Sequence, residues 1–317
     1  MISKLPLKEK IRNYEWKTDG RSLRMGVGCA WLGRHMEDAQ AVRKDVALLD
    51  ECYECGARYF DTSCDYGKSE LLMGEWLKHA PRQNIFLATK GRYDYWTPNP
   101  LERLKRNFYE SFERLHVDHI DMYLLHDADA YGVMEQEALP FLLDRQKEGM
   151  IDYIGQGTRD VNAHQHAIAG GVMDGVLSYL QFCLIQTAAR EAALEAKKAG
   201  IAFINGSPLA AGILIAPQEV KPIRNYTRTQ EDMRFAAEMR ALLEREGIDP
   251  VAAALQYPLL FDEIDMTLTG TSNMGELKST LKGLQTTIHP EQWARIFRLQ
   301  ESYRFFHLQP EYAKNRE

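Results

Sequence analysis

Short apolar runs alternate with longer amphipathic segments along the chain. Eight runs have the length and residue types of buried parallel strands. Segments with helical periodicity, such as LERLKRNFYESFERL and QTAAREAALEAKKAG, fill most of the intervals. Because neighbouring parallel strands need a crossover connection, this pattern predicts a parallel sheet. The runs are LRMGVGC (23–29), RYFDT (58–62), NIFLATK (84–90), IDMYLLH (120–126), MIDYIGQG (150–157), GVLSYLQ (175–181), GIAFING (200–206) and DMTLTGT (265–271).

Eight such units in 317 residues predict an α/β fold with one domain over residues 1–317, a closed (β/α)8 TIM barrel. The alternative is an open, doubly wound sheet. Sheets of that type that bind dinucleotides carry a GxGxxG turn after the first strand. The closest segment here, Gly26-Val27-Gly28-Cys29-Ala30-Trp31, lacks the third glycine. We therefore favour the closed barrel.

Two segments lie outside the repeat, and one long loop lies within it. Residues 9–28 predict a strand, an Asp19-Gly20 turn and a second strand, an N-terminal β-hairpin that we expect to close the barrel floor. Residues 290–312 predict a C-terminal helix followed by an aromatic tail. Residues 206–230 are rich in turn-forming residues, which on a barrel scaffold favours a functional loop.

Composition and charge restrict the class of protein. The chain has 45% hydrophobic and 26% charged residues, and its formal net charge is −6, as expected for an ordinary globular protein. Without a basic run, we expect neither nucleic acid nor an anionic membrane to be its partner. No stretch approaches the roughly 18 consecutive apolar residues of a membrane span, and the N-terminus lacks the apolar core of a signal peptide. We expect a cytoplasmic protein, and the sequence leaves its oligomeric state open.

The five cysteines indicate no metal site. Cys52 and Cys55 form a CxxC pair on an amphipathic helical run, but no second Cys or His pair follows at zinc-ligand spacing. We interpret them as structural thiols.

Polar residues occupy the ends of three successive strand runs. In a barrel of this class the chemistry lies at the C-terminal ends of the strands. The second, third and fourth runs end in Asp61, Lys90 and His126, and Tyr66 follows shortly after the second. Each residue alone is compatible with capping, packing or solvent exposure. Together they predict a catalytic site.

These four side chains have the chemistry of a proton-transfer device. A tyrosine titrates near a pKa of about 10, so proton exchange near neutrality requires a downward shift of about three units, roughly 4 kcal/mol. The Lys90 ammonium can lower the pKa of Tyr66, with Asp61 holding the lysine charged. His126 can donate a hydrogen bond to a substrate carbonyl or join a proton relay. Because the site offers no metal or activated nucleophile, a bound cofactor must supply the difficult step.

The sequence resembles the aldo-keto reductase family over almost its full length. FDTSCDYG (60–67), ATKG (88–91) and DMYLLHD (121–127) are similar to that family's tyrosine, lysine and histidine motifs. The resemblance implies a (β/α)8 barrel that binds NAD or NADP across its mouth without a Rossmann domain. It also implies Tyr66 as the general acid/base, Lys90 and Asp61 as the residues that tune it, and His126 as the residue that orients the carbonyl.

The same resemblance implies a set of cofactor contacts. Gln181 is similar to the glutamine that binds the nicotinamide carboxamide, and Ser207-Pro208-Leu209 is similar to the loop around the pyrophosphate. Gly270-Thr271-Ser272-Asn273 is similar to the turn that receives the adenosine phosphate. Gly28 and Thr158, at the ends of the first and fifth runs, are assigned to the same site.

The chain departs from the family pattern at three places. Gly157-Thr158-Arg159 replaces the usual Ser-Asn, and Gly206 replaces a tyrosine that often stacks on the nicotinamide. These features and the segment 126–129 are more similar to the aldose and L-galactose dehydrogenase branch. Glu276 stands where many NADP-dependent members carry a basic residue, which favours NAD because a carboxylate repels a 2′-phosphate. Lys278 is the counterargument, since it can compensate that charge.

Aromatic residues in loops are the candidates for contacting a small-molecule carbonyl or sugar substrate, although packing within the loops is the alternative for each. They are Trp31, Tyr93, Tyr95, Trp96, Tyr303, Phe305 and Phe306.

The sequence therefore predicts an NAD(P)-dependent oxidoreductase that interconverts a carbonyl with an alcohol, or a sugar lactol with a lactone, by hydride transfer. Two alternatives stay open: a Schiff-base aldolase that uses Lys90 as the nucleophile, and a cofactor-binding regulatory subunit without catalysis. The substrate and the physiological direction are not determined by the sequence.

Overall fold

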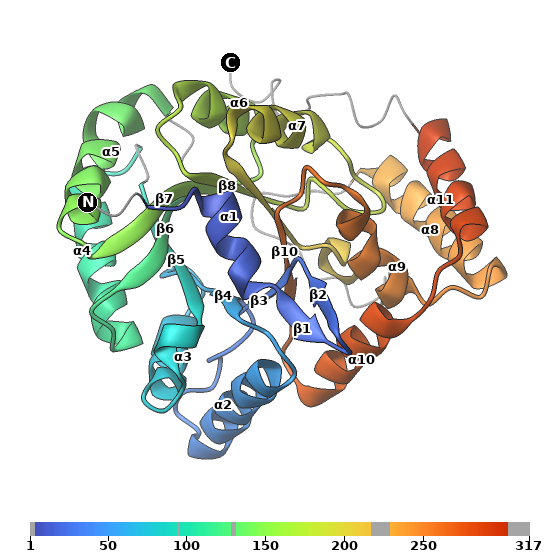
Figure 1. The fold of residues 1–317 in the computed structure, drawn as a ribbon, viewed down its shortest axis with the longest axis horizontal. Helices are drawn as coiled ribbons and strands as arrows, with labels where there is room; N and C mark the ends of the chain where they lie inside the picture. The colour runs from blue at the N-terminus through green and yellow to red at the C-terminus, as the bar shows by residue number, and fades with distance from the viewer. Residues whose placement is uncertain (1–3, 94–95, 128–130, 217–228, 304–317) are drawn as a thin grey trace.

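Eight parallel strands close into a barrel in a computed structural model that describes residues 4–93, 96–127, 131–216 and 229–303 (Figure 1). The order around the barrel is β10-β3-β4-β5-β6-β7-β8-β9, with β9 pairing back to β10. The predicted (β/α)8 barrel is confirmed, and the open sheet is excluded. The strands are β3 (Met25–Gly28), β4 (Tyr59–Asp61), β5 (Phe86–Arg92), β6 (Ile120–His126), β7 (Ile151–Thr158), β8 (Gly175–Tyr179), β9 (Ala202–Gly206) and β10 (Met266–Gly270).

Helices surround the barrel and cover its outer face (Figure 1). In α4, Leu104, Phe108, Phe112 and Leu115 recur at helical spacing, and all four are buried. Among the residues that the structure describes, no helix combines the length and the apolar character needed to cross a membrane. The helices are α2 (Ala39–Glu54), α3 (Ser69–Leu77), α4 (Pro100–Leu115), α5 (Tyr131–Lys147), α6 (Val161–Gly170), α7 (Arg190–Ala199), α8 (Gln230–Arg245), α9 (Pro250–Gln256), α10 (Met274–Gln285) and α11 (Pro290–Ser302), with 3-10 turns η2 (Arg82–Asn84), η3 (Ala210–Gly212) and η4 (Tyr257–Leu260).

The N-terminal segment differs in part from its prediction. The hairpin is confirmed as β1 (Trp16–Thr18) and β2 (Arg21–Leu23), joined through Asp19 and Gly20 with φ of 46° and 71°. The prediction starts the first strand too early, because residues 7–14 are helical. They form α1 (Leu7–Lys10) and η1 (Ile11–Tyr14).

The helical turn, rather than the hairpin, fills the floor of the barrel. Leu7 and Ile11 are 2% and 0% exposed and pack with Tyr59 and Met122 inside the barrel. Leu7 also lies against Gly175, the first residue of β8. Burial of this apolar pair therefore outweighs the strand pattern that the sequence suggested.

The inward-facing positions change in character along the strands. The lower layers are apolar, with Phe86, Met122, Leu124 and Leu268 among the residues that pack inside the barrel. By alternation, the last inward positions of four strands carry glycine, and inward positions at or near the ends of the other four carry polar side chains. The apolar core thus ends below the mouth, where the polar side chains face the opening. These positions are Gly28, Gly157, Gly206, Gly270, Asp61, Lys90, His126 and Tyr179.

The cysteines are free in the structure. Cys52 is buried in α2, where burial raises the pKa of its thiol to about 12, and Cys55 is half-buried at the end of the same helix. A thiol with so high a pKa is chemically inert near neutrality, as expected for a structural cysteine.

Candidate active site

Asp61 and Lys90 form a buried ion pair between β4 and β5. Lys90 Nζ lies 2.5 Å from Asp61 Oδ1 and 2.7 Å from the carbonyl oxygen of Thr62. Although burial disfavours the ammonium, the Asp61 carboxylate and Tyr66 raise the pKa of Lys90 to about 12. The lysine is therefore held protonated, whereas a Schiff-base nucleophile needs a free amine.

Tyr66 lies beside this ion pair, on the turn between β4 and α3. Lys90 Nζ is 4.7 Å from the centroid of the Tyr66 ring. Burial raises the pKa of Tyr66, and the Lys90 ammonium opposes this through its charge and a hydrogen bond. The contribution of Lys90 has the sign that the sequence predicted, but the net direction is upward, because burial is the larger effect.

His126 completes the group from the end of β6. Its ring meets the edge of the Tyr66 ring, with centroids 5.7 Å apart and planes at 90°. His126 Nδ1 lies 3.0 Å from Ser63 Oγ and 3.4 Å from Asp65 Oδ2. The four residues predicted from the strand ends therefore come together at the mouth of the barrel.

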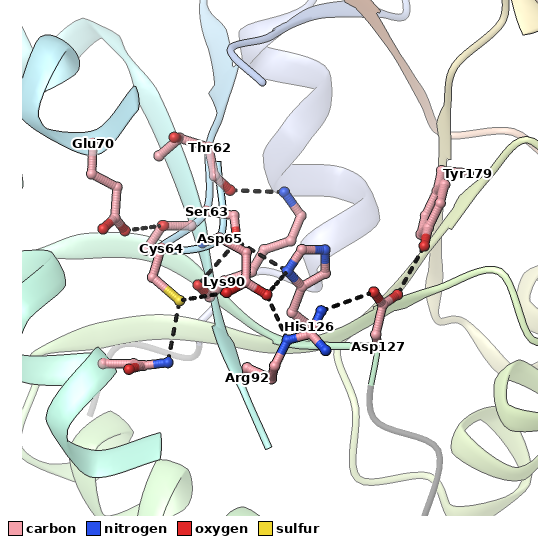
Figure 2. A network of polar contacts seen from close by, with 12 residues as sticks. Thr62, Ser63, Cys64, Asp65, Glu70, Lys90, Arg92, His126, Asp127 and Tyr179 are labelled. Atoms are coloured by element: carbon pink, nitrogen blue, oxygen red, sulfur yellow. Dashed lines mark hydrogen bonds and ion pairs between the residues drawn. The ribbon is translucent and has the colours of Figure 1, made fainter. Parts of the chain in front are cut away.

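A polar network that the sequence reasoning missed continues from His126 across the mouth (Figure 2). Arg92 donates from Nε to Asp65 Oδ2 at 2.6 Å and from Nη2 to Asp127 Oδ2 at 3.4 Å. The Tyr179 hydroxyl donates to Asp127 Oδ1 at 2.9 Å. The carboxylates and the guanidinium therefore fix one another's positions at this edge of the site.

Two of these residues, Arg92 and Tyr179, lie at strand ends that differ from the predicted ones. We placed the end of the third run at Lys90, but β5 continues to Arg92, the next inward position. We ended the sixth run at Gln181, but β8 ends at Tyr179. Strand alternation is the signal that could have found both residues.

Glycines occupy the inward strand ends on one side of the mouth. A Cβ placed on Gly28 would lie 3.8 Å from its nearest neighbour, and one on Gly270 would lie 3.2 Å from Trp31 Cδ1. A Cβ on Gly206 would lie 3.0 Å from Tyr179 Cβ. A side chain at Gly206 or Gly270 would therefore crowd Tyr179 or Trp31, whereas Gly28 has ordinary contact distances around it.

The start of α10 offers the predicted phosphate donors. Asn273 caps the helix by accepting a hydrogen bond from Glu276 N at 3.0 Å. The Glu276 carboxylate folds back and accepts from the backbone N and the hydroxyl of Ser272, at 2.6 Å and 2.9 Å. Thr271 is buried, and its hydroxyl donates to the Asn273 carbonyl at 3.3 Å.

The other predicted cofactor residues lie at the same end of the barrel. Ser207, with φ of 60°, and Leu209 follow β9 in a turn where Ala210 and Ala211 also have left-handed backbone, a strained form typical of functional loops. Gln181 is buried directly after β8. Thr158 ends β7 but alternates with inward-facing Gly157, so its side chain lies on the outer face of the sheet, where it accepts from Asp160 N at 3.1 Å.

The aromatic substrate candidates separate into two groups. Trp31 and Trp96 are 47% and 77% exposed, and Arg34 stacks on Trp31 with its guanidinium carbon 4.5 Å from the ring. Tyr93 is 1% exposed and donates to Glu137 of α5 at 2.8 Å, whereas Tyr303 stacks on Phe235 at 4.2 Å. Tyr95, Phe305 and Phe306 lie outside the described residues.

Comparisons with known proteins agree on one family. The sequence model of the Aldo/keto reductase family matches residues 24–301. L-galactose dehydrogenase of Arabidopsis thaliana is 29% identical over 247 residues, which cover 74% of this chain and 76% of that protein. D-threo-aldose 1-dehydrogenase of a Pseudomonas species is 25% identical over 307 residues, 86% of this chain and 92% of that protein.

A solved structure supports the fold independently. The holo form of an aldo-keto reductase from Bacillus halodurans superposes with a TM-score of 0.71 at 24% identity, covering 90% of this chain and 95% of that one. The family match spans all eight barrel strands and the ends that carry Asp61, Lys90 and His126. The chain thus belongs to the aldo/keto reductase family and is an NAD(P)-dependent oxidoreductase of carbonyl and CH–OH groups.

Proposed function

We propose that this protein interconverts a sugar lactol and its lactone, or an aldose carbonyl and its alcohol, with Tyr66 as the general acid/base. The observation that carries the proposal is the meeting of Tyr66, His126 and the Lys90–Asp61 pair at the barrel mouth. The bound nicotinamide would accept or supply the hydride, and we place its ring on the glycine side of the mouth, beside Gly28 and Gly270.

The chain's own residues would move and hold the proton. In the oxidative direction, the substrate hydroxyl gives its proton to the Tyr66 oxygen as the hydride leaves carbon. In reduction, the Tyr66 hydroxyl protonates the new alkoxide. Lys90 favours the phenolate by its positive charge, and Asp61 keeps the lysine charged and in place.

A sugar is the substrate class that best matches the rest of the mouth. Asp65, Arg92 and Asp127 present carboxylate and guanidinium groups that can hydrogen-bond to several hydroxyl groups. Exposed Trp31 offers an aromatic surface for the carbon face of a sugar ring. The names of the related L-galactose and D-threo-aldose dehydrogenases support the same class.

A turnover screen tests the proposal. Aldoses, uronates and simple aldehydes are offered with NAD(H) and NADP(H), and absorbance of the reduced cofactor is followed. We expect turnover with at least one aldose. The absence of turnover with every carbonyl and sugar would contradict the proposal, and a borohydride-trapped adduct on Lys90 would favour the aldolase instead.

We also propose that the enzyme prefers NAD. The Glu276 carboxylate accepts from the Ser272 N–H and hydroxyl, two donors that a 2′-phosphate on the adenosine would need. A phosphate must therefore displace a carboxylate that is also negatively charged, whereas a 2′-hydroxyl can donate to it. Exposed Lys278, two residues further along α10, is the group that could offset this charge.

Glu276→Arg is expected to shift the preference towards NADP by about 1 to 2 kcal/mol, the scale of a charge-assisted hydrogen bond. The measurement compares kcat/KM for NAD and NADP on the wild type and the variant. Glu291→Arg, which makes the same charge change at an exposed residue in the first turn of α11, is the control and should leave the ratio unchanged. A wild-type enzyme that favours NADP more than tenfold would rule out this role of Glu276.

A further inference from the structure

Three buried polar side chains lie side by side on the outer wall of the barrel. Ser178 of β8, Asn205 of β9 and Thr267 of β10 are each 0% exposed. Asn205 is the register partner of both Ser178 and Thr267. The preceding residues of β8 and β9, Leu177 and Ile204, pack inside the barrel. By alternation, the three polar side chains therefore point outward, towards the layer of helices.

These side chains have no hydrogen-bond partner among the residues that the structure describes. The unpartnered atoms are Ser178 Oγ, Asn205 Oδ1, Asn205 Nδ2 and Thr267 Oγ1. Helix α7 packs against β9. Its buried face consists of Ala192, Ala193 and Ala196. Because alanine has no polar side-chain atom, that helix cannot satisfy the Asn205 amide.

A similar residue across the barrel is satisfied directly by the protein. Thr89 is buried on β5, which lies across the barrel from β9. It alternates with inward-facing Lys90, so its side chain also points outward. Its hydroxyl donates to Glu70 Oε1 of α3 at 2.6 Å. Buried polar groups are almost always satisfied either in this way or by ordered water. For the row on β8, β9 and β10, water is the partner that is left.

The spacing of the row fits one water molecule in each gap. Neighbouring strands lie about 4.8 Å apart. A water that makes two hydrogen bonds of about 2.8 Å at a tetrahedral angle joins atoms about 4.6 Å apart. An amide has two N–H donors and an oxygen with two lone pairs, so Asn205 can bind a water on each side. The hydroxyls of Ser178 and Thr267 can donate or accept, and all three side chains are neutral, so they suit water rather than an ion.

We propose that two ordered water molecules bind between the barrel wall and the helices. One bridges Ser178 to Asn205, and the other bridges Asn205 to Thr267. The bridges tie β8, β9 and β10 together on their outer face. Tyr179 and Gly206, the next residues along β8 and β9, face the barrel mouth instead. The water site is therefore separate from the mouth and does not depend on the proposed function.

A high-resolution crystal structure of the wild-type protein tests the site directly. We expect a water in both gaps, each within hydrogen-bond distance of the Asn205 amide and of the neighbouring hydroxyl. A gap without water would overturn the inference. So would an Asn205 amide that bonds directly to Ser178 or Thr267.

Chemical denaturation tests the site in solution, because its presence decides the sign of one effect. Asn205→Leu replaces the amide by an apolar side chain of similar size. If water bridges the row, this variant leaves the hydroxyls of Ser178 and Thr267 without their bridges, and the folding equilibrium constant should fall about ten- to a hundredfold. If the amide had no partner, removing it should raise that constant. A rise would overturn the inference.

A double-mutant cycle distinguishes loss of the bridge from poor packing of the new leucine. Thr267→Val keeps the shape of the side chain but removes its hydroxyl. The double variant Asn205→Leu/Thr267→Val should lose about tenfold less than the product of the two single losses, because the same bridge is lost only once. Thr89→Val is the matched control, since its hydroxyl bonds directly to Glu70, and its loss should simply multiply that of Asn205→Leu. Independent effects at Asn205 and Thr267 would also overturn the inference.

Discussion

Tyr66→Phe is expected to lower turnover by about 10²- to 10⁴-fold, the usual contribution of a general acid/base. The substitution removes the hydroxyl that exchanges the proton but keeps the ring that packs against His126 and under the Lys90 ammonium. Cofactor affinity should therefore change little. Steady-state kcat on the best substrate from the screen measures the first effect, and quenching of tryptophan fluorescence by NAD or NADP measures the second.

Tyr109→Phe is the matched control for this substitution. Tyr109 lies on α4 at the outer surface, is 42% exposed, and accepts a hydrogen bond from Arg145. Removing its hydroxyl should leave kcat within a factor of about two, since exposed polar contacts contribute little. If Tyr66→Phe kept more than a third of the wild-type rate while chemistry limits turnover, Tyr66 would not be the acid/base.

The barrel could be predicted because its strands are buried on both faces. Such strands appear in the sequence as short apolar runs, and the predicted run 120–126 coincides with β6. The N-terminal helical turn was missed although it has a signal: Leu7 and Ile11 are four residues apart and follow Pro6, a residue typical of helix starts. The alternating strand pattern starts only at Trp16, and the prediction extends it into the helical residues before it.

The site was predictable where it depends on strand ends and not where it depends on loop conformation. Asp61, Lys90 and His126 could be found because a polar residue at the inward end of a barrel strand has no packing explanation. Asp127 contacts both Arg92 and Tyr179, and its own backbone is left-handed, with φ of 48°. The sequence does not reveal this conformation. The net rise in the pKa of Tyr66 also needs the structure, because burial and the Lys90 charge act in opposite directions.

Lys90→Met is expected to move the onset of alcohol oxidation to higher pH. In the wild type the ammonium lowers the pKa of Tyr66 against the effect of burial. Without it, burial acts unopposed and the phenolate forms only at more alkaline pH. The measurement is the pH profile of kcat/KM for the alcohol or lactol. An unchanged inflection in a folded Lys90→Met protein would show that Lys90 does not tune Tyr66.

The same substitution is expected to lower the free energy of unfolding by about 3 to 5 kcal/mol, because it leaves the buried Asp61 carboxylate without its partner. The pH dependence of stability should also change. In the wild type the pKa of Lys90 rises from 10.5 to about 12 on folding, so the part of the stability that is linked to this shift is complete below pH 10.5 and is lost as the pH rises through 12. The variant should lack that alkaline loss. Burial raises the pKa of Asp61, and without Lys90 this effect is larger, so the variant should gain more stability than the wild type as the pH falls.

The double variant Lys90→Met/Asp61→Asn separates tuning from folding. A neutral amide at position 61 removes the uncompensated charge, so the double variant should recover most of the stability that Lys90→Met loses. It should not recover the wild-type pH profile, because the cation beside Tyr66 is still missing. Chemical denaturation and the pH profile are measured on the same three proteins. If the double variant regained both stability and the wild-type inflection, the effect of Lys90 on the pH profile would come from folding rather than from its charge.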